Sequence, residues 1–417
     1  MITMIFGIIQ LSLFYLLVVE GYGSSIGMKR IATKKLSMQF NDNMDTPCVI
    51  KVVGVGGGGG NAITRMLECG VDGVNFAVAN TDQQALSHPR FSSLPKLNIG
   101  NDVSKGLGAG GNPEIGRLAA EESRAEILNL VQGSDLVFVT AGMGGGTGSG
   151  AAPVVAEIAR EAGALTVGVV TKPFGFEGRR RMQQAIESID VLRDCVDTLI
   201  VVSNDRLLEI IPENTPVQRA FAVADDVLRQ GVVGISEIII RPGIINVDFA
   251  DVRSIMKDAG TALMGVGKGT GKTRAEDAAA AAIASPLLDF PITDAKGVVF
   301  NVIGGKDITL QEINAAAEVI YGAVDSNANI IFGALIDENI TDEVSVTVVA
   351  TGFPEGRQIG SSRVVERSMN NIDAQSIPRS ASRAFGEISD SPNTRIGGES
   401  NEDRDVPDFL KNLRRKR

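Results

Sequence analysis

Histidine and tryptophan are nearly missing from this chain of 417 residues. It holds one histidine, His88, no tryptophan, and only 5% aromatic residues. A single histidine excludes a metal site with several histidine ligands and argues against a Ser-His-Asp triad. The shortage of aromatic rings argues against a stacking platform for single-stranded nucleic acid.

Cysteine and positive charge are also in short supply. The three cysteines, Cys48, Cys69 and Cys195, show neither metal-site nor redox spacing, so we read them as reduced, partly buried thiols. The net charge of −10 argues against nonspecific nucleic-acid binding, so we expect no nucleic-acid partner. The single histidine and the cysteine spacing lead us to expect no protein-held metal site. The chain is long enough, and with 44% hydrophobic residues apolar enough, for two domains.

Glycine, in contrast, is abundant and clustered. The run 144–150 reads Gly-Gly-Gly-Thr-Gly-Ser-Gly and lies between an apolar run, 136–141, and a helical pattern, 151–162. So few side chains let backbone N–H groups approach a polyphosphate, and the helix N-terminus behind them adds partial positive charge. Thr147 and Ser149 add hydroxyl donors. We predict a phosphate loop; the alternative is a flexible turn, which rarely needs so many glycines.

Two further glycine segments support this prediction. Gly54, Gly56 and Gly59 satisfy G-x-G-x-x-G between a predicted strand, 49–53, and a helix from Asn61. The third segment, 106–111, precedes a predicted helix with Pro113 near its first turn. Loops that follow strands of one parallel sheet meet at its carboxyl edge, where ligands of open α/β sheets bind.

A fourth glycine segment, 265–273, resembles a Walker A motif but has the wrong spacing. That motif needs four residues between its first glycine and Gly-Lys-Thr, and Val266 stands where the first glycine belongs. We predict a mobile surface loop over 267–273, followed by a helix at 274–284.

Strands and helices are predicted to alternate through the middle of the chain. Predicted strands lie near 49–54, 74–80, 136–141, 165–170 and 199–203, and predicted helices near 61–69, 114–130, 151–162 and 179–194. This alternation is typical of a mostly parallel sheet covered on both faces. A 3.6-residue apolar period predicts a long helix over 217–231. Strands near 297–303, 329–335 and 344–350, with a helix at 311–322, indicate a smaller α/β domain.

Four motifs together resemble FtsZ, the tubulin-like division GTPase. They are Gly-Val-Gly-Gly-Gly-Gly-Gly-Asn at 54–61, the run 144–150, Phe-Glu-Gly-Arg-Arg-Arg at 176–181 and Asn-Val-Asp-Phe-Ala-Asp-Val at 246–252. The resemblance extends from about Cys48 to Phe353. It departs from the family at Ser149, where the family usually has Thr, but a hydroxyl is kept.

The resemblance implies a tubulin/FtsZ-like α/β fold, with a Rossmann-like parallel-sheet GTPase domain joined by a long core helix to a smaller α/β domain. The expected divisions are a leader (1–47), a nucleotide-binding domain (48–216), a connector helix (217–233), a C-terminal α/β domain (234–353), a disordered linker (354–404) and a C-terminal docking peptide (405–417).

The resemblance also implies a GTP site. The residues it assigns to the nucleotide are Gly57, Gly58, Gly59, Gly60, Asn61, Gly148, Ser149, Gly150, Glu177, Arg181, Asn204, Phe221 and Asp225. Phe221 is expected to cover the guanine. Asp225 is chemically suited to bind guanine, because its carboxylate can accept hydrogen bonds from N1–H and N2–H₂, a pair of donors that adenine lacks. Glu177 and Arg181 match ribose and phosphate contacts; the alternative is a simple i,i+4 helix pair.

Asn246, Asp248 and Asp251 are the expected catalytic group. The alternative for one of the two aspartates is N-capping of a helix. In FtsZ this segment enters the nucleotide site of the next subunit, where carboxylates position or polarise the attacking water. Hydrolysis of GTP to GDP then requires assembly, and Mg²⁺ is expected at the phosphates without a protein cage of its own.

The two ends of the chain differ from the middle. Residues 5–19 are strongly apolar, and from 21 to 41 there is no acidic residue, as in a two-part import signal for a plastid of secondary origin. The alternative is a start codon at Met28, Met38 or Met44. At the other end, Phe409 and Leu410 lie on an apolar ridge similar to the FtsZ peptide that binds membrane tethers and regulators; the alternative is an unbound basic tail.

The function we expect is a GTPase that polymerises head to tail into filaments forming a division ring. We favour the chloroplast stroma because 304–314 and 329–337 resemble plant and cyanobacterial FtsZ; a bacterial cytoplasm or the mitochondrial matrix are alternatives, and an FtsZ paralogue is a possible partner. The competing functions are an NAD-dependent Rossmann oxidoreductase, with Asp82 on the ribose, and a non-hydrolysing structural filament protein.

Overall fold

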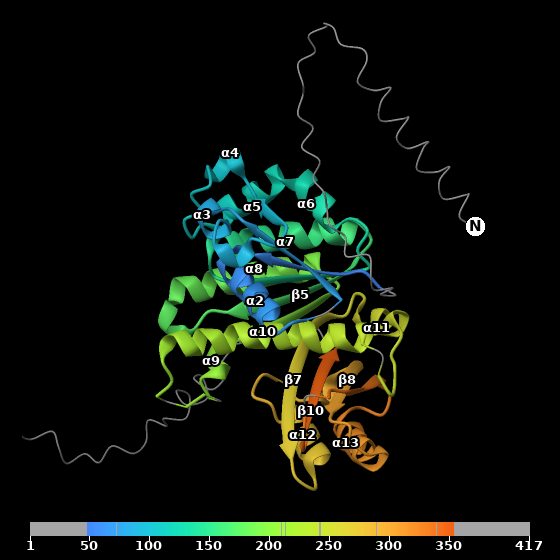
Figure 1. Cartoon of the computed structure of the whole chain (residues 1–417). Helices are drawn as coiled ribbons and strands as arrows, with labels where there is room; N and C mark the ends of the chain where they lie inside the picture. The colour runs from blue at the N-terminus through green and yellow to red at the C-terminus, as the bar shows by residue number, and fades with distance from the viewer. Residues whose placement is uncertain are drawn as a thin grey trace, which may run out of the picture. The chain divides into compact units, whose positions relative to one another are not determined.

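The structure is a computed structural model that describes residues 48–353 apart from single residues at 72, 210, 213, 242, 289 and 339 (Figure 1). The expected leader (1–47), linker (354–404) and docking peptide (405–417) lie outside the described residues.

Ten strands form one sheet in the described part of the chain. They are β1 (Ile50–Val55), β2 (Val74–Asn80), β3 (Lys96–Asn98), β4 (Leu136–Gly142), β5 (Leu165–Lys172), β6 (Thr198–Ser203), β7 (Gly260–Thr270), β8 (Gly297–Gly304), β9 (Asn329–Ile336) and β10 (Glu343–Thr351).

Helices connect and cover these strands. The α-helices are α2 (Gly56–Glu68), α3 (Gln83–Leu86), α4 (Asn101–Ser104), α5 (Pro113–Glu122), α6 (Arg124–Val131), α7 (Gly146–Glu161), α8 (Arg179–Cys195), α9 (Asn204–Leu207), α10 (Val217–Ile240), α11 (Phe249–Met256), α12 (Arg274–Ile283) and α13 (Leu310–Ala323). The 3₁₀-helices are η1 (Pro89–Phe91), η2 (Gly175–Glu177) and η3 (Ile292–Asp294).

The strand order confirms the predicted Rossmann-like sheet. The order is β3-β2-β1-β4-β5-β6-β7-β10-β8-β9, and every pair from β3 to β7 is parallel. The chain moves outward from β1 through β2 and β3, then crosses to β4 on the other side of β1. In open α/β sheets such a switch point is where ligands bind. The helices that follow β1 and β4 both begin with the glycine runs.

Helices cover both faces of the parallel part of the sheet. α2 and α10 share one buried core with Ile50 and Val52 of β1, while α7 packs on β4 and β5 from the other face, flanked by α5 and α8. Figure 1 shows α10 as the long helix that runs past both domains. It extends to Ile240, beyond the predicted end at Gly231, because its apolar face stays buried through Ile238 and Ile239.

The smaller domain is built on the antiparallel part of the same sheet. β10 lies between β7 and β8 and is antiparallel to both, whereas β8 and β9 are parallel. α12 and α13 cover one face through a core that includes Phe300 and Ile320. β7 belongs to both domains, because its first residues pair with β6 and the rest pair with β10.

The predicted loop over 267–273 is wrong for its first half. Residues 267–270 belong to β7, and only 271–273 connect it to α12. A Cβ added at Gly265, Gly267 or Gly269 would meet the backbone of α12. Alternate glycines therefore let this Ala-rich helix lie directly on the strand. They are packing residues, and this segment is not a phosphate loop.

The helix predicted over 114–130 is two helices. Ser123 departs from helical geometry (φ −97°, ψ 22°) between α5 and α6. Its hydroxyl accepts a hydrogen bond from the backbone N–H of Gly100, 3.0 Å away, so a contact distant in sequence holds the break.

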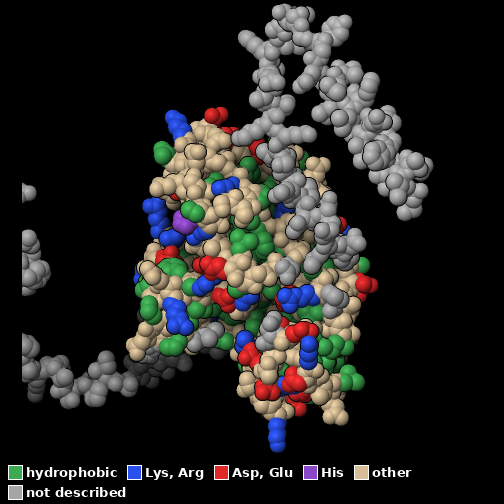
Figure 2. All heavy atoms as spheres, viewed as in Figure 1, with side chains coloured by type: hydrophobic (Ala, Val, Ile, Leu, Met, Phe, Trp, Pro, Cys, Tyr) green, Lys and Arg blue, Asp and Glu red, His purple; other side chains and the backbone are tan. Residues whose placement is uncertain are grey.

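The face of the protein seen in Figure 2 carries Lys and Arg side chains interspersed with Asp and Glu. Within residues 48–353, as far as they are described, no helix has both the length and the apolarity needed to cross a membrane.

Candidate functional site

The glycine runs form the first turns of two helices. α2 begins at Gly56 and α7 at Gly146, earlier than the predicted starts at Asn61 and Ala151. Glycine is a poor helix former, so the sequence alone argued for loops. The first N–H groups of a helix have no partner inside it, so both runs present donors at the sheet's switch point.

Two of these glycines keep the helix starts in contact. A Cβ added at Gly58 would come within 2.9 Å of the backbone nitrogen of Gly142, and one at Gly56 within 3.0 Å of that of Gly148. Any side chain there would separate α2 from β4 and α7. Gly59 and Gly60 are likewise enclosed, against Thr140 and Phe91.

Gly57 and Gly145 differ from these packing glycines. A Cβ added at either would meet no atom within 4 Å. They therefore line open space at the starts of the two helices, where a ligand's phosphates can approach the backbone. Asn61, one turn further along α2, is exposed.

The third glycine segment joins the other two, as the sequence predicted. A Cβ added at Gly146 would come within 2.9 Å of the backbone nitrogen of Asn112, so this loop packs on the start of α7. Asn112 caps α5 by accepting from the N–H of Glu114 at 3.0 Å, and Pro113 occupies the first turn. Gly110 and Gly111 have positive φ (56° and 77°), which favours glycine there.

The hydroxyls of the run 144–150 organise the loop itself. The oxygen of Ser149 accepts from the N–H of Gly144 at 2.8 Å, and the hydroxyls of Thr147 and Thr81 lie 2.7 Å apart. Ser149 is buried, and its neighbours Gly148 and Gly150 are packed against Gly142 and Pro113. A hydroxyl that accepts one bond can still donate its own proton, so Ser149 can both shape the loop and bind a phosphate oxygen.

Aromatic side chains gather at the carboxyl edge beyond β5. Phe174 is buried and stacks on Phe176 with ring centroids 5.1 Å apart, and Phe221 of α10 meets Phe174 edge-on at 5.2 Å. Phe176 and Phe221 remain 66% and 39% exposed. Their exposed faces can cover a flat, aromatic ligand group such as a base.

Polar groups suited to a base lie beside these rings. Asn204 follows β6 and is buried, and within the described residues its side-chain oxygen has no hydrogen-bond partner. An unpaired buried oxygen is costly unless a ligand supplies the donor. Burial raises the pKa of Asp225 to about 6, against the opposing charges of Arg65 and Arg90. Its neighbour Asp226 instead accepts from Arg229 at 2.7 Å along the helix.

Glu177 and Arg181 form the ion pair that we considered as their alternative role. Arg181 lies 3.0 Å from one carboxylate oxygen of Glu177, and the other oxygen accepts from the N–H of Phe174 at 2.9 Å. Glu177 is thus tied into the turn that carries the aromatic residues. Arg181 is half exposed and keeps donors free to face a ligand.

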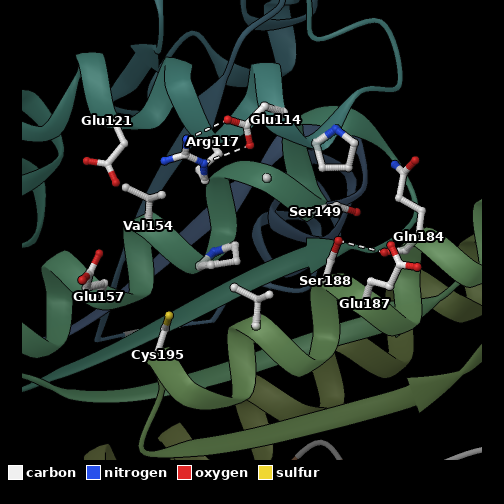
Figure 3. Close-up of a pocket in the computed structure, with 14 residues that line it drawn as sticks. Glu114, Arg117, Glu121, Ser149, Val154, Glu157, Gln184, Glu187, Ser188 and Cys195 are labelled. Carbon is white, nitrogen blue, oxygen red and sulfur yellow. Dashed lines mark hydrogen bonds and ion pairs between the residues drawn. The ribbon is translucent and has the colours of Figure 1, made fainter.

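Two cavities lie beside the glycine loops, and Gln184 lines both of them. One, of about 330 Å³, is lined by Gly110, Gly111, Gly144, Glu177, Gly178, Arg180, Arg181 and Gln184. The other, of about 350 Å³, is the groove between α5, α7 and α8 shown in Figure 3. Its charged lining residues are four glutamates and Arg117, which is paired with Glu114. The glycine-lined cavity has two arginines and one glutamate, so its charge is the one suited to phosphates.

Comparison with known proteins identifies the family. The GTPase domain of the Tubulin/FtsZ family matches residues 49–212, and the C-terminal domain of the FtsZ family matches 260–354. An empty FtsZ dimer from M. jannaschii is 48% identical, with a TM-score of 0.70 over 73% of this chain and 88% of that one. This chain belongs to the FtsZ family.

Two other solved structures extend the comparison. A mutant FtsZ from M. jannaschii is 47% identical, with a TM-score of 0.70 over 73% of this chain and 91% of that one. A GTPγS-bound protofilament of CetZ2 from Haloferax volcanii is 21% identical, with a TM-score of 0.62 over 77% of this chain and 96% of that one. At that identity the CetZ2 match shows the shared fold alone.

Membership of the FtsZ family confirms the predicted family and fold, and it displaces the oxidoreductase alternative. The structure agrees, because the carboxylate of Asp82, the proposed ribose ligand, caps α3 by accepting from Gln84 and Ala85. The two FtsZ domain matches leave residues 213–259 unmatched, and these carry Phe221, Asp225 and the expected catalytic group.

The expected catalytic residues lie away from the nucleotide residues of the same chain. Asn246, Asp248 and Asp251 are all exposed, in and before α11, beyond the far end of α10 from Phe221. Figure 1 shows α9 and α11 at opposite ends of α10. Asp248 is the N-cap residue of α11, but its side chain makes no capping hydrogen bond, so the capping role that we considered for it is absent.

Sequence reasoning missed Gln184 and Thr81, which contact the glycine loops from α8 and from the end of β2. Neither has a glycine motif around it. For Gln184, the available signal was its place on α8, about two turns after Glu177. Among the described residues, no group of three or more His, Cys, Asp or Glu side chains could hold a metal ion.

Proposed function

We propose that this protein binds GTP at the carboxyl edge of its sheet and hydrolyses it only after head-to-tail assembly with a second copy. In this proposal Asp248 and Asp251 of one subunit reach the phosphates held by the next. They position or polarise the water that attacks the terminal phosphorus, and GDP and phosphate leave. Such transfer depends mostly on positioning and charge stabilisation, so an added loop can switch it on.

The separation along α10 carries this proposal. The helix has 24 residues, which corresponds to about 36 Å. Phe221 and Asp225 lie near its start, where Phe221 meets the ring of Phe174, and Asp248 and Asp251 follow its end. A carboxylate that far from the phosphates cannot orient water in its own subunit, whereas a subunit added along this axis can bring its own pair to the site.

The rate of hydrolysis against protein concentration tests this proposal. We expect activity per subunit to rise steeply above a critical concentration, because an isolated subunit lacks half of the site. A constant rate per subunit over a hundredfold dilution would indicate a site complete in one chain. GTP-dependent filaments with no phosphate release at any concentration would support the alternative of a non-hydrolysing filament.

The nucleotide is proposed to enter with its base at Phe221 and its phosphates at Gly57 and Gly145. The unpaired oxygen of Asn204 and the carboxylate of Asp225 supply acceptors for a base that carries N–H donors, and guanine has them. The positions assigned to Gly58, Gly59, Gly60, Gly148 and Gly150 serve by keeping side chains out, as their close contacts indicate.

Mg²⁺ is proposed to bind with the nucleotide. This fits a site that offers glycine backbone and hydroxyls beside the phosphates, since Mg²⁺ usually keeps several waters and binds substrate phosphates. Removing Mg²⁺ with EDTA should abolish hydrolysis while GTP binding survives in weakened form. Full turnover in EDTA would exclude the ion.

We propose that the filaments form a division ring and that the chain's last residues recruit a partner. The empty FtsZ dimer from M. jannaschii, which is 48% identical to this chain, supports self-association. Phe409 and Leu410 form the apolar part of the proposed docking peptide for a membrane tether or regulator. Changing both to Ala should leave GTPase activity and polymerisation intact but prevent ring placement. Normal placement by a chain ending at Arg404 would exclude this tether role.

The ring is proposed to act in a chloroplast stroma, with an FtsZ paralogue as a candidate partner. The support is the apolar segment 5–19, the basic, acid-free segment 21–41 and the plant-like and cyanobacterial-like segments 304–314 and 329–337. A fluorescent fusion of the full chain should enter the plastid, and one starting at Met44 should not. Identical distribution of both fusions would favour a bacterial origin or another start site.

A further inference from the structure

Gln184 connects two glycine loops that are far apart in sequence. Its side-chain nitrogen, on α8, lies 3.2 Å from the carbonyl oxygen of Gly111 and 3.1 Å from each of those of Gly144 and Gly145, so its two N–H donors are shared among three acceptors. The residue is half-buried and lines both cavities, so it lies between the glycine-lined cavity and the groove of Figure 3.

These contacts fix the direction of two backbone donors. In a trans peptide the C=O and the following N–H point to opposite sides. Holding the carbonyls of Gly144 and Gly145 toward Gln184 therefore turns the N–H groups of Gly145 and Gly146 away from it. These residues are the N-cap and first residue of α7, and Gly145 borders open space. Their N–H groups are among those that a helix leaves unpaired for a ligand.

The third contact restrains the tip of the loop at 106–112, whose neighbouring residues Ala109 and Asn112 lie against Gly146 of α7. A Cβ added at Gly110 or Gly111 would meet no atom within 4 Å, so little packing restrains this tip of the loop. Gly110 and Gly111 both have positive φ and belong to the lining of the glycine-lined cavity. The contact from Gln184 adds a polar link between Gly111 and the phosphate loop at this tip.

We propose that Gln184 is a positioning residue for phosphate binding. It holds the N–H groups of Gly145 and Gly146 toward the phosphates and closes the 106–112 loop beside them. The proposal rests on the proposed function, because it assumes that the ligand is a nucleotide with phosphates at this edge. Gln184 touches no reacting atom, so its effect is on the phosphate part of binding and not on the base.

Gln184→Met and its neighbour Gln183→Met form a matched pair for the test. Gln183 is exposed and donates to Glu187 at 2.9 Å, away from the loops. We expect Gln184→Met to weaken GTP binding by about tenfold, the effect of losing a hydrogen bond in a polar network. Guanosine binding should stay within about twofold. Gln183→Met should change neither.

Amide hydrogen exchange and a second variant provide independent readouts. In Gln184→Met, exchange should accelerate in peptides covering 106–112 and 144–147 and stay unchanged in β4. Gln184→Glu places a carboxylate against three carbonyl oxygens. At pH 8 this variant should therefore lose much more affinity for GTP than for guanosine, relative to wild type. This selective loss of GTP affinity should be smaller at pH 5.5, where a protonated carboxyl can donate a hydrogen bond to the carbonyls.

Three outcomes would overturn the proposal. One is GTP affinity that stays within twofold in both Gln184 variants. Another is an equal loss of GTP and guanosine binding, which would indicate general damage to the fold. The third is a wild-type protein that binds neither GTP nor guanosine. That result would contradict the proposed function itself, and it would be known before any variant is measured.

Discussion

The hydroxyl oxygen of Ser149 accepts a hydrogen bond from the backbone N–H of Gly144, 2.8 Å away. The two residues belong to one glycine run, and the bond bends the chain between the end of β4 and the first turn of α7. Ser149 is 3% exposed, so water cannot easily replace the bond. The shape of the phosphate loop therefore depends on a hydroxyl within the loop.

Replacing Ser149 by Ala should weaken GTP binding by about 0.5–1.5 kcal/mol, because the N–H of Gly144 loses its partner. Ser149→Thr is the control, since it keeps the hydroxyl and restores the residue that FtsZ usually has. A nucleotide titration of both variants measures the effect. Equal affinities for Ala and Thr would mean that the hydroxyl does not shape the site.

Replacing Asp225 by Asn should weaken GTP binding and at the same time raise the stability of the nucleotide-free protein. One acceptor oxygen becomes a donor facing the donors of the base, so GTP binding should weaken by at least about 1–3 kcal/mol. The nucleotide-free variant should melt at a higher temperature at pH 7, because a buried carboxylate that is charged there no longer opposes folding. Unchanged GTP affinity would remove Asp225 from the site.

The pH dependence of Asp225 follows from its raised pKa. The folded protein binds this proton more tightly than the unfolded chain, so the group's cost to stability grows as pH rises from about 4 to about 6. The melting-temperature advantage of Asp225→Asn should therefore disappear near pH 4. Wild-type GTP affinity should fall as pH drops below about 6, as the acceptor becomes protonated. An advantage independent of pH would contradict the assignment.

The glycines of β7 give a prediction about stability alone. Gly267→Ala places a Cβ against the backbone of α12 and should destabilise the fold by about 1–3 kcal/mol. Gly322→Ala in α13 is the control: its Cβ would meet no atom within 4 Å, so it should stabilise by about 0.5–1 kcal/mol. Denaturant titrations compare the two. A neutral Gly267→Ala would mean that α12 does not lie so close to the strand.

The sequence predicted the sheet well because apolar runs between glycine segments carry a clear signal. It placed the starts of α2 and α7 too late, because helix propensity argues against glycine in a helix. The close contacts that demand glycine, such as those of Gly56 and Gly58, are seen only in the folded protein. It missed the strand character of 267–270 because glycine is uncommon in strands. Here Gly267 and Gly269 leave room for α12, which follows later in the chain and lies on the strand.

The candidate site could be predicted from motifs for some residues and from the family resemblance alone for others, such as Phe221 and Asp225. The glycine runs, Glu177 and Arg181 carry such motifs, and the structure brings them together at one edge of the sheet. Gln184 acts through three carbonyls of glycine loops that only folding brings to it. Asp248 and Asp251 stay apart from the site in a single chain, so their assignment as catalytic residues remains a prediction.

Mixing two inactive variants tests the central claim, catalysis across a subunit junction, most directly. Asp251→Ala should bind GTP normally but hydrolyse it orders of magnitude more slowly. Gly57→Asp should fold, because its side chain enters open space, but its carboxylate should repel the phosphates. Each alone should be nearly inactive. A mixture should recover part of the turnover, because some junctions pair an intact pocket with an intact Asp251. No recovery in mixed filaments, or loss of GTP binding in Asp251→Ala, would contradict the account.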